Sequence, residues 1–453
     1  MSTPRNTFLD DALMDEGAFE RRSRPRATRR IALGGLLVLV LAAGCPRPQA
    51  DKPKPADAGH PRPSAASVTL TIGVGDDPQL AAAIELLAGE WREVSGGRFE
   101  VRPLEDGGAT ADLIVFSPLA LGGLCDAGTL RPVRDSALRS DALAVEDLYP
   151  AVREQLISYG GRLMALPLGC VTPLAVSQGE GEVRWAEVAQ AGPLRPAWRL
   201  LAQAAPLAVH ELRESVLFDP ESMAPKITSE PFVAALEALV AAPPADQAPA
   251  QLVVPSRPAE AVAGTAKGVR VSPLPGASRF YHPVRNEWIT VNGAPRRVSL
   301  VGVDGRLVGV TAASRNGAAA FKLAAWLAGK SNARQLAQAS RHVANVRRSL
   351  SRLPDDWQGQ GAAGLGREFA AALDAAWQNK LRLVAPRLIE VERYLVALDD
   401  AVQQAIDGQS EPLDALRQAA DRWDTLTDEV GRQRQRSCYL RHLGVEQYEP
   451  PKR

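Results

Sequence analysis

The sequence of 453 residues has little that would indicate a catalytic or metal centre. Its five histidines are scattered, and their spacing fits neither the zinc-protease motif nor another metal motif. Neither a Gly-x-Ser-x-Gly elbow nor a phosphate-binding P-loop occurs. The 53 basic and 52 acidic residues leave a formal charge of +1, which gives no support to a nucleic-acid partner. We therefore expect no enzyme, no cofactor and no metal site.

Cysteine is also scarce, with four residues in the whole chain. After Cys45, the remaining three are Cys125, Cys170 and Cys438, which lie far apart and form no Cys-x-x-Cys pair. This spacing suggests neither a zinc site nor a redox motif. In an oxidising compartment, one disulfide among the three is an open alternative, and the sequence does not select a pair.

One apolar run stands out near the N-terminus. Ile31–Gly44 follows Arg29–Arg30 and contains about 14 mostly apolar residues, a pattern typical of a secretory signal peptide. The run is too short for a transmembrane helix, which needs roughly 20 residues. The small residues that lead into Cys45 resemble the bacterial lipobox. That resemblance implies that Cys45 becomes the lipidated first residue of the mature protein.

Alternatives for the leader stay open. They are a plain signal peptide cleaved elsewhere, an uncleaved anchor, and a true start at Met14 in place of Met1. The following segment, 45–67, is rich in proline, and such linkers adopt extended polyproline II structure. We therefore expect a signal peptide at 1–44 and a tether at 45–67 that holds a folded body away from a membrane.

The body begins with alternating strand and helix patterns. Val68–Val74 alternates apolar and polar residues, which predicts a strand, and a second strand is expected at Phe99–Leu104. Asp76–Asp77–Pro78 offers a helix cap and a favoured first helical residue. Ala111–Phe116 is an apolar run typical of a buried parallel strand, so the order predicts an α/β layer. The helix between the first two strands is expected to bury one face, formed by Leu80, Ile84, Leu87 and Trp91.

Two hairpins and a helical C-terminus are predicted further along. Ile157–Leu168 predicts a hairpin that turns at Gly160–Gly161, and Val298–Thr311 predicts two short strands that turn at Asp304–Gly305. The stretch Trp185–Met223 is expected to be mostly helical. Apolar residues at helical spacing predict further helices at Phe232–Val240, Ala318–Leu327, Glu368–Lys380, Leu388–Ile406 and Pro412–Val430.

Several segments carry a resemblance to a known family. ADLIVF at 111–116 is followed by LGGLCDAGTLRPV, and DLYPAVREQLISYGGRLMALPLG covers 147–169. VLFDPESMAPKITSEPFVAALEAL, VRVSPLPG and AAFKLAAWLAG follow, with NVRRSL beyond them. In this order, and with the lipobox, these segments resemble the extracellular solute-binding proteins of bacterial ABC importers. The branch that they resemble is the sugar-binding family that includes maltose-binding protein, over about Val68 to Gly444.

The resemblance implies an α/β class and a two-lobed, periplasmic-binding-protein-like type II fold with hinge crossovers and C-terminal helices. On this sequence, lobe one is expected at 68–170 plus 271–329, lobe two at 171–270 plus 330–444, and a tail at 445–453. The implied mechanism is closure of the lobes on a ligand. The expected solute is a sugar, delivered to the permease subunits of an ABC transporter. The implied protein is an extracytoplasmic, lipid-anchored monomer.

Candidate ligand-binding residues follow from these expectations. Ligands of open α/β sheets bind beyond the carboxyl ends of strands, where Asp76 and Ser117 are expected. Sugars are held by aromatic faces and by polar side chains that satisfy hydroxyl groups. The full set of candidates is Asp76, Asp77, Phe116, Ser117, Thr172, Trp185, Tyr281, Trp288 and Arg347.

Each candidate has a structural alternative that stays open. The aspartates can cap the following helix, and the aromatic residues can pack in a core or against a lobe surface. Thr172 can be an ordinary hinge residue. Arg347, which lies in the segment that resembles the family's Arg-containing stretch, can form a structural ion pair. For Trp377, helical spacing favours the core.

Two other functions remain as alternatives. The first is an orphan or sensor binding module that signals to a membrane receptor. Ser177–Arg184 motivates it, because SQGEGEVR replaces the aromatic-containing stretch that is usual in the family. The second is a secreted hydrolase or structural lipoprotein, which a clustered acid/base pair in a deep cleft would favour. The identity of the solute, the partner permease and the choice of membrane do not follow from the sequence.

Overall fold

The computed structural model describes residues 68–104, 110–178, 181–209, 215–255, 269–352 and 363–449. The chain separates into two units, Met1–Arg62 and Pro63–Arg453, and every described residue belongs to the second. The predicted signal peptide, the lipidation of Cys45, the alternative start at Met14 and the tether therefore lie outside the described residues. Within the described ranges, no helix combines the length and the apolar composition that a membrane span needs.

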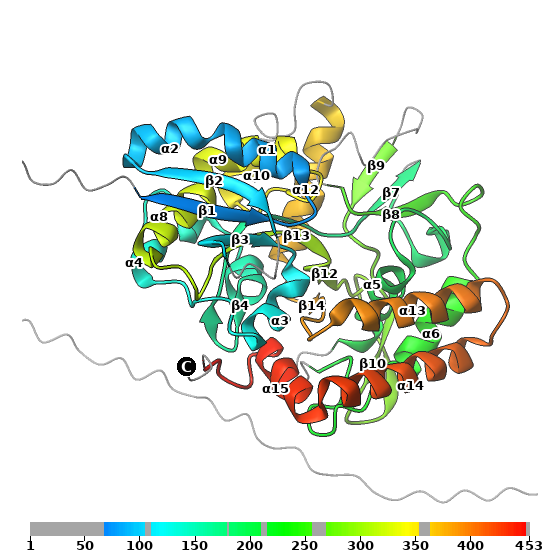
Figure 1. Cartoon of the computed structure of the whole chain (residues 1–453). Coiled ribbons are helices and arrows are strands. Elements are labelled where there is room, and N and C mark those ends of the chain that lie inside the picture. Colours follow the sequence, from blue (N-terminus) through cyan, green and yellow to red (C-terminus); the bar gives the residue numbers. More distant parts are fainter. Residues whose placement is uncertain are drawn as a thin grey trace, which may run out of the picture. The chain divides into compact units, whose positions relative to one another are not determined.

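The first sheet has five strands in the order β2-β1-β3-β13-β6 (Figure 1). Its strands are β1 (Thr69–Val74), β2 (Arg98–Pro103), β3 (Leu113–Phe116), β6 (Leu166–Val171) and β13 (Asp304–Val310). The strands predicted at 68–74, 99–104 and 111–116 are thereby confirmed. β1 is parallel to β2 and β3, whereas β13 is antiparallel to β3 and β6. Consequently, the ends of β1, β3 and β6 and the start of β13 meet at one edge of the sheet.

The central strand β3 is buried on both faces, as its apolar run predicts. Successive side chains of a strand point to opposite faces. Leu113 and Val115 accordingly join one hydrophobic core, and Ile114 and Phe116 join another. The longer helices that contribute to the core of Leu113 and Val115 are α1 (Pro78–Leu86), α2 (Ala88–Ser95), α8 (Gly317–Leu327) and α9 (Lys330–Ala339), and the short helix that contains Ala137 adds to it.

The predicted helical face after β1 is buried, although it belongs to two consecutive helices. Its four residues, Leu80, Ile84, Leu87 and Trp91, are all at most 3% exposed. α1 ends at Leu86 and α2 begins at Ala88, so the chain bends between them. Trp91 then packs against Trp326 of α8, with 5.3 Å between the ring centroids. This contact fixes α2 to a helix that lies more than two hundred residues later in the chain.

The second sheet has three antiparallel strands in the order β8-β7-β9. They are β7 (Leu174–Gln178), β8 (Ala250–Val253) and β9 (Val269–Ser272). β7 follows β6 after only two residues, so the chain passes directly from the first sheet to the second. A third core holds residues from this sheet together with four helices. Those helices are α5 (Pro196–Ala208), α6 (Glu230–Val240), α13 (Val391–Ile406) and α14 (Pro412–Val430).

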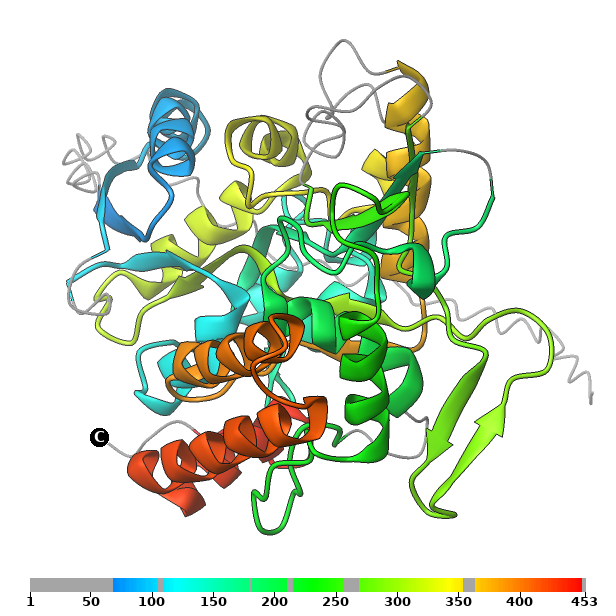
Figure 2. The ribbon, with the colours of Figure 1, turned by 90° about the vertical axis from the view of Figure 1, so that its right-hand side faces the viewer.

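Three pairs of short strands complete the sheet structure. β4 (Ser158–Tyr159) and β5 (Arg162–Leu163) form the predicted hairpin, and both of its turn glycines have positive φ angles. β10 (Arg279–His282) and β11 (Glu287–Thr290) form a second hairpin, which projects from the rest of the molecule in Figure 2. β12 (Ser299–Val301) pairs in parallel with β14 (Arg382–Val384), which joins two distant parts of the chain.

The predicted hairpin turn at Asp304–Gly305 is wrong. β12 and β13 lie on either side of this region as expected, but β12 pairs with β14, and β13 pairs with β3 and β6. Asp304–Gly305 is instead the start of β13. Gly305 has a φ of +148°, and a Cβ atom there would lie 2.9 Å from the Cα atom of Cys170. The glycine therefore allows β13 to pack closely against β6. An Asp-Gly pair in the sequence does not show whether the glycine forms a hairpin turn or permits such close packing.

The helical predictions are mostly confirmed, with three differences. The helix expected through Trp185–Met223 is wrong over most of that range, because among its described residues, 185–209 and 215–223, only a 3-10 turn at Trp185–Glu187 and α5 are helical. Residues 215–223 form turns, and Met223 has a φ of +62°. The sequence also predicts a helix at Leu148–Leu156, and the structure has a π-helix there, Val152–Leu156. A last helix, α15 (Arg432–His442), was not predicted, because it starts directly after the stop residue Gly431.

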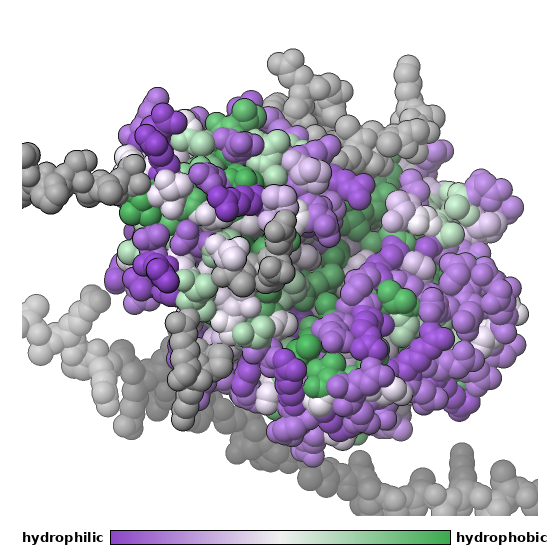
Figure 3. All heavy atoms as spheres, in the orientation of Figure 1, coloured by the Kyte–Doolittle hydropathy of each residue, from purple (hydrophilic) through white to green (hydrophobic). Residues whose placement is uncertain are grey.

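The remaining helices are short or lie between the sheets. They are the 3-10 turns Pro118–Ala120 and Val145–Asp147, and the helices α3 (Leu121–Asp126), α4 (Asp135–Leu138), α10 (Arg348–Ser351) and α12 (Ala363–Gln378). In Figure 3, the outward surface over α13 and α14 is mostly hydrophilic, as their amphipathic spacing requires. Trp377 of α12 is fully buried, in agreement with its helical spacing.

The three described cysteines are free thiols, and all are buried. The disulfide left open by the sequence is therefore not present among Cys125, Cys170 and Cys438. Burial raises the pKa of the Cys438 thiol to about 11. At neutral pH this thiol is protonated and therefore a weak nucleophile.

Two adjacent glycines of α3 give a matched test of the packing. A Cβ atom at Gly122 would lie 2.0 Å from the carbonyl oxygen of Arg387, whereas nothing lies within 4 Å of one at Gly123. We expect Gly122→Ala to lower the free energy of unfolding by about 3 kcal/mol, because backbone atoms must move. Gly123→Ala should raise it by about 0.5–1 kcal/mol, because alanine favours the helix. Urea unfolding of both variants measures the difference, and equal stabilities would contradict this packing.

Candidate functional site

Polar residues gather at the sheet edge where β1 and β3 end and β13 begins. Gly75, Asp76 and Asp77 follow β1, and Ser117 follows β3. The register pairs Asp304 with Val171 at the end of β6, and Leu307 with Phe116 at the end of β3. Ligands of open α/β sheets bind beyond such strand ends. We therefore take this edge as the candidate site.

Asp77 is the structural centre of this edge. Its side chain is 4% exposed, and its Oδ1 atom accepts a hydrogen bond from the backbone nitrogen of Leu80 at 3.0 Å. It is therefore the N-cap of α1, which satisfies a backbone donor that the helix itself cannot satisfy. Its Oδ2 atom accepts a hydrogen bond from Ser340 Oγ at 2.5 Å. This second bond ties the start of α1 to the end of α9.

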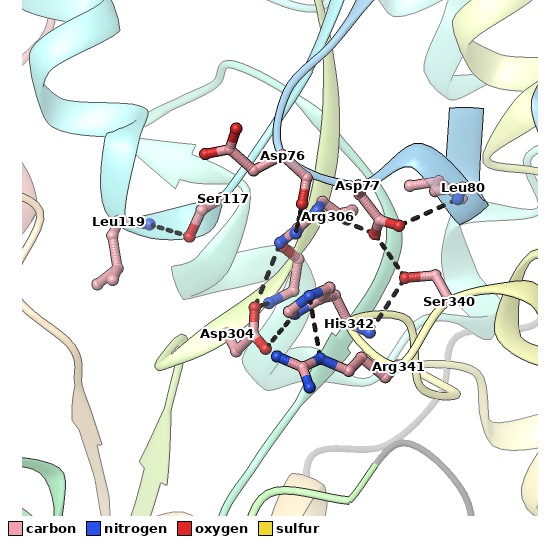
Figure 4. A network of polar contacts seen from close by, with 11 residues as sticks. Asp76, Asp77, Leu80, Ser117, Leu119, Asp304, Arg306, Ser340, Arg341 and His342 are labelled. Atoms are coloured by element: carbon pink, nitrogen blue, oxygen red, sulfur yellow. Dashed lines mark hydrogen bonds and ion pairs between the residues drawn. The ribbon is translucent and has the colours of Figure 1, made fainter. Parts of the chain in front are cut away.

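Arg306 lies between two carboxylates (Figure 4). Its Nε atom is 3.3 Å from Asp77 Oδ2, and its Nη1 atom is 3.3 Å from Asp304 Oδ1. The side chain is almost fully buried, and it also donates to the carbonyl oxygen of Gly305 at 2.8 Å. A buried cation is tolerated when it is paired and hydrogen-bonded, and both conditions hold here.

His342 extends the network from the segment after α9. Its Nδ1 atom lies 2.6 Å from Asp304 Oδ2. The backbone nitrogen of His342 also donates to Ser340 Oγ at 3.1 Å. The network thus joins residues that follow β1, begin β13 and follow α9 into one polar cluster. We call Asp76, Asp77, Asp304, Arg306, Ser340 and His342 the strand-end network.

Asp76 differs from its neighbour because its carboxylate is exposed. Its backbone oxygen accepts a hydrogen bond from Arg306 at 3.5 Å. Among the described residues, its carboxylate has neither a hydrogen bond nor an ion pair, and Figure 4 shows it pointing away from Arg306. Ser117 caps the 3-10 turn that follows β3, with its Oγ atom 3.4 Å from the backbone nitrogen of Leu119. These two side chains can therefore still bind the hydroxyl groups of a solute.

Three other candidates have structural contacts. Phe116 is 5% exposed and packs in the core below the first sheet. Thr172 is fully buried, and its hydroxyl donates to the carbonyl oxygen of Leu300 at 2.8 Å. This bond ties the crossover between the two sheets to β12. Arg347 is 1% exposed, pairs with Asp147 at 3.6 Å and donates to the carbonyl oxygen of Ala328.

Trp185, Tyr281 and Trp288 lie on other elements. Trp185 packs half-buried against the core of the second sheet. Tyr281 and Trp288 face each other across the β10–β11 hairpin, with 5.4 Å between their ring centroids. The guanidinium of Arg279 lies 4.4 Å from the centroid of the Trp288 ring. In the described part of the chain, no hydrogen bond, ion pair or ring contact joins these three residues to the strand-end network.

Four residues of the strand-end network were not predicted from the sequence: Asp304, Arg306, Ser340 and His342. Asp304 was assigned to a turn, and His342 was noted only as an isolated histidine. An observation that Val298–Thr311 returns into the first sheet as an antiparallel strand would have placed Asp304 and Arg306 at the ligand edge. That pairing is non-local, so neither propensity nor spacing indicates it.

Comparisons with known proteins agree on the fold. No protein-family model matches the chain, and no curated protein matches it. Solved structures do match. The sugar-binding protein MalE from Xanthomonas citri has a TM-score of 0.61 at 16% identity, over 80% of this chain and 98% of that one. A solute-binding protein of an ABC transporter from Agrobacterium radiobacter, in complex with ribitol, has a TM-score of 0.57 at 17% identity, over 79% and 98%.

A third similar structure is the GacH receptor of Streptomyces glaucescens, solved without a ligand and with acarbose. It has a TM-score of 0.56 at 15% identity, over 80% of this chain and 99% of that one. Because the chain covers almost the whole of each structure, the likeness extends to both lobes. The expected α/β, two-lobed, type II periplasmic-binding-protein-like fold is thereby confirmed.

Neighbouring aspartates test whether the strand-end network is structural. We expect Asp77→Asn to lower the free energy of unfolding by about 3 kcal/mol, because it leaves Arg306 buried with one counter-charge fewer. Asparagine can still cap α1, so the loss reports on the ion pair. Asp76→Asn is the control and should change stability by less than about 0.5 kcal/mol. Denaturant unfolding measures the free energy of unfolding of both variants. An equal loss of stability in the two would contradict the structural role of Asp77.

Proposed function

We propose that this chain is an extracytoplasmic solute-binding protein that captures a small carbohydrate or polyol and delivers it to an ABC permease. The observation that supports this most directly is the two-lobed fold, which the chain shares over nearly the whole length of solved sugar- and polyol-binding proteins. In this proposal the ligand lies at the strand-end edge and bridges the two lobes. Ligand binding then shifts an open–closed equilibrium, with no chemical step.

The lobes in this proposal are those predicted from the sequence, with two segments moved according to their packing. α9 packs against α1 and β6, and we therefore assign it to the lobe of the first sheet. β10 and β12 pack against α5, and we assign them to the lobe of the second sheet. The crossover through Thr172 and Pro173 is the proposed hinge. The hydrogen bond from the Thr172 hydroxyl to the carbonyl oxygen of Leu300 holds this hinge segment against β12.

Recognition of a polyhydroxylated solute follows from the free groups at the edge. The Asp76 carboxylate accepts hydrogen bonds from hydroxyl groups, and the Ser117 hydroxyl both donates and accepts. The bond from Arg306 to the backbone oxygen of Asp76 holds that residue without using its carboxylate. Among the remaining candidates, Phe116, Thr172, Trp185, Tyr281, Trp288 and Arg347 stay proposals for ligand contact at other stages of closure.

A ligand panel tests capture directly. The full chain is heated with monosaccharides, maltodextrins, ribitol and mannitol, and its melting temperature is recorded. A solute that binds only the folded chain adds about 2.7 kcal/mol of stability at a hundredfold excess over its dissociation constant. We expect one class of solute to raise the melting temperature. The absence of any shift across the panel would contradict sugar or polyol capture.

Variants at the edge then locate the bound solute. We expect Asp76→Asn and Ser117→Ala to weaken binding of that solute about tenfold each, because each removes one hydrogen bond to a ligand. Glu85→Gln, an exposed acidic residue on α1, is the matched control and should bind normally. Titration calorimetry measures all three. Unchanged affinity in both edge variants would move the ligand site elsewhere.

The proposed membrane anchor has its own test. We expect Cys45→Ala to release the chain from the membrane fraction of a bacterial host, because the residue that would carry the lipid is lost. Radioactive fatty acid should label the wild-type chain and not the variant. A variant that stays with the membrane fraction would point to the uncleaved-anchor alternative for the leader.

An orphan or sensor module is the second candidate function. The strand-end network favours it, because Arg306 satisfies Asp77 and Asp304 internally and leaves fewer groups for a solute. Uptake of the bound solute by cells without the gene separates the two functions. Loss of uptake supports import, whereas normal uptake with a lost transcriptional response to the solute supports a sensor.

A further inference from the structure

A second candidate site, a partly open cavity, lies away from the strand ends. A cavity of about 260 Å³ is lined by residues of the π-helix 152–156, the β4–β5 hairpin, β14 and α15. Figure 1 shows β4, β14 and α15 in the lower middle of the view. The volume is far above the roughly 10–15 Å³ that one water molecule needs. The cavity shares no residue with the strand-end network, so it can hold a different ligand.

The charges that line this cavity are strongly unequal. Four cationic side chains contribute to its wall, from Lys380, Arg382, Arg387 and Arg441, and one carboxylate does, from Glu154. Arg441 is also paired with Glu446 at 2.7 Å, so the excess of positive charge comes mainly from the other three cations. Glu154 is exposed and forms an ion pair with Arg153 at 3.6 Å, so its negative charge is partly compensated. Two unit charges close together in a partly buried site interact strongly, so this excess of cations favours an anion.

Arg387 is the most unusual of these residues. It is 3% exposed, and among the described residues it has no carboxylate within ion-pair distance. Its donors instead reach the carbonyl oxygens of Gln155 and Ser158, at 2.8 and 2.6 Å, and both Nδ1 and the carbonyl oxygen of His442. These bonds satisfy its N–H groups but do not neutralise its charge. A buried charge without a counter-ion is costly, so a bound anion would stabilise the structure.

Several donors at the cavity wall remain available. Among the described residues, Lys380 has no ion pair or hydrogen bond, and the Nε atom of Arg441 is buried without a partner. Arg382 uses Nε for Gln155 and Nη1 for Asn379, which leaves its Nη2 group. His442 accepts at Nδ1 from Arg387, so its neutral ring carries the proton on Nε2 and is a further donor.

We propose that this cavity is a binding site for a small multivalent oxyanion, such as phosphate or a di- or tricarboxylate. Lys380, Arg382 and Arg441 supply charge-assisted hydrogen bonds, and His442 supplies a neutral donor. Arg387 forms the positive floor of the site. The wall combines Ser158 from the β4–β5 hairpin with Leu217 and Tyr439, which belong to the core of the second sheet. An anion in this cavity therefore connects parts of both lobes.

Thermal unfolding of the full chain tests the site. Sodium phosphate, sulfate and citrate are compared with sodium chloride at equal ionic strength, in buffer without any sugar. The salts are used at low millimolar concentration, where the general stabilisation by kosmotropic anions is small, and we expect the multivalent anions to raise the melting temperature in a saturable way and chloride to have no effect, because a ligand of the folded state adds stability. Equal effects of all salts at matched ionic strength would overturn the proposal. A failed sugar panel would leave this result unaffected, because the two sites share no residue.

Substitutions of the charged residues in the cavity wall should change the affinity for the anion in opposite directions. We expect Lys380→Gln and Arg382→Gln to weaken phosphate or citrate binding about tenfold each, because each removes a charged donor. Glu154→Gln should instead strengthen binding, because it removes the single carboxylate of the wall. Lys322→Gln, which removes an exposed cation on α8, is the matched control and should bind normally. If all four variants bind like the wild type in calorimetry, the cavity is not an anion site.

Discussion

The first sheet depends on one strand that arrives late in the chain. β13 lies between β3 and β6, so its hydrogen bonds join the early strands to the strand that leads into the second sheet. Two glycines allow this close fit. A Cβ atom at Gly305 would lie 2.9 Å from Cys170 Cα, and one at Gly309 would lie 2.7 Å from a methyl group of Leu130. The same strand brings Asp304 and Arg306 to the edge that carries the candidate site, so the pairing that completes the sheet also sets the geometry of that site.

The sequence predicts well what is local. The periodicity of Leu80, Ile84, Leu87 and Trp91 indicates a buried helical face, and the apolar run 111–116 indicates a strand buried on both sides; both are found. Asp77 is correctly indicated as a cap, because capping involves residues three positions apart. Order along the chain and the resemblance to a known family were enough to predict the two-lobed fold.

What the sequence did not predict is non-local. Asp304–Gly305 has the composition of a hairpin turn, yet its neighbours in space are β6 and the end of β3, which lie more than a hundred residues earlier. Arg306 is one charged residue among many until the pairing places it beside Asp77. Arg387 likewise gives no signal in the sequence, because its partners are backbone carbonyl groups and the ring of His442, 55 residues later. Spacing within a segment cannot indicate contacts of this kind.

The strand-end network also explains how a polar edge can be rigid before any ligand arrives. Asp77 and Asp304 are both held by Arg306, and Asp304 is held again by His342. Side chains that already have their hydrogen-bond and ion-pair partners need little reorganisation. A ligand that contacts their neighbours therefore loses little free energy to the ordering of side chains. The same arrangement limits specificity, because charged groups that satisfy one another are less available to distinguish one solute from another.

The contacts of the last residues with the first lobe bear on how the chain folds. The Tyr448 hydroxyl donates to the carbonyl oxygen of Cys125, 323 residues earlier, and Gly160 exchanges backbone hydrogen bonds with Arg441 and Tyr448. Contacts between such distant residues slow folding, because a long loop must close before they form. In a chain with this connectivity, the segments around Cys125 and Gly160 reach their final packing late in folding.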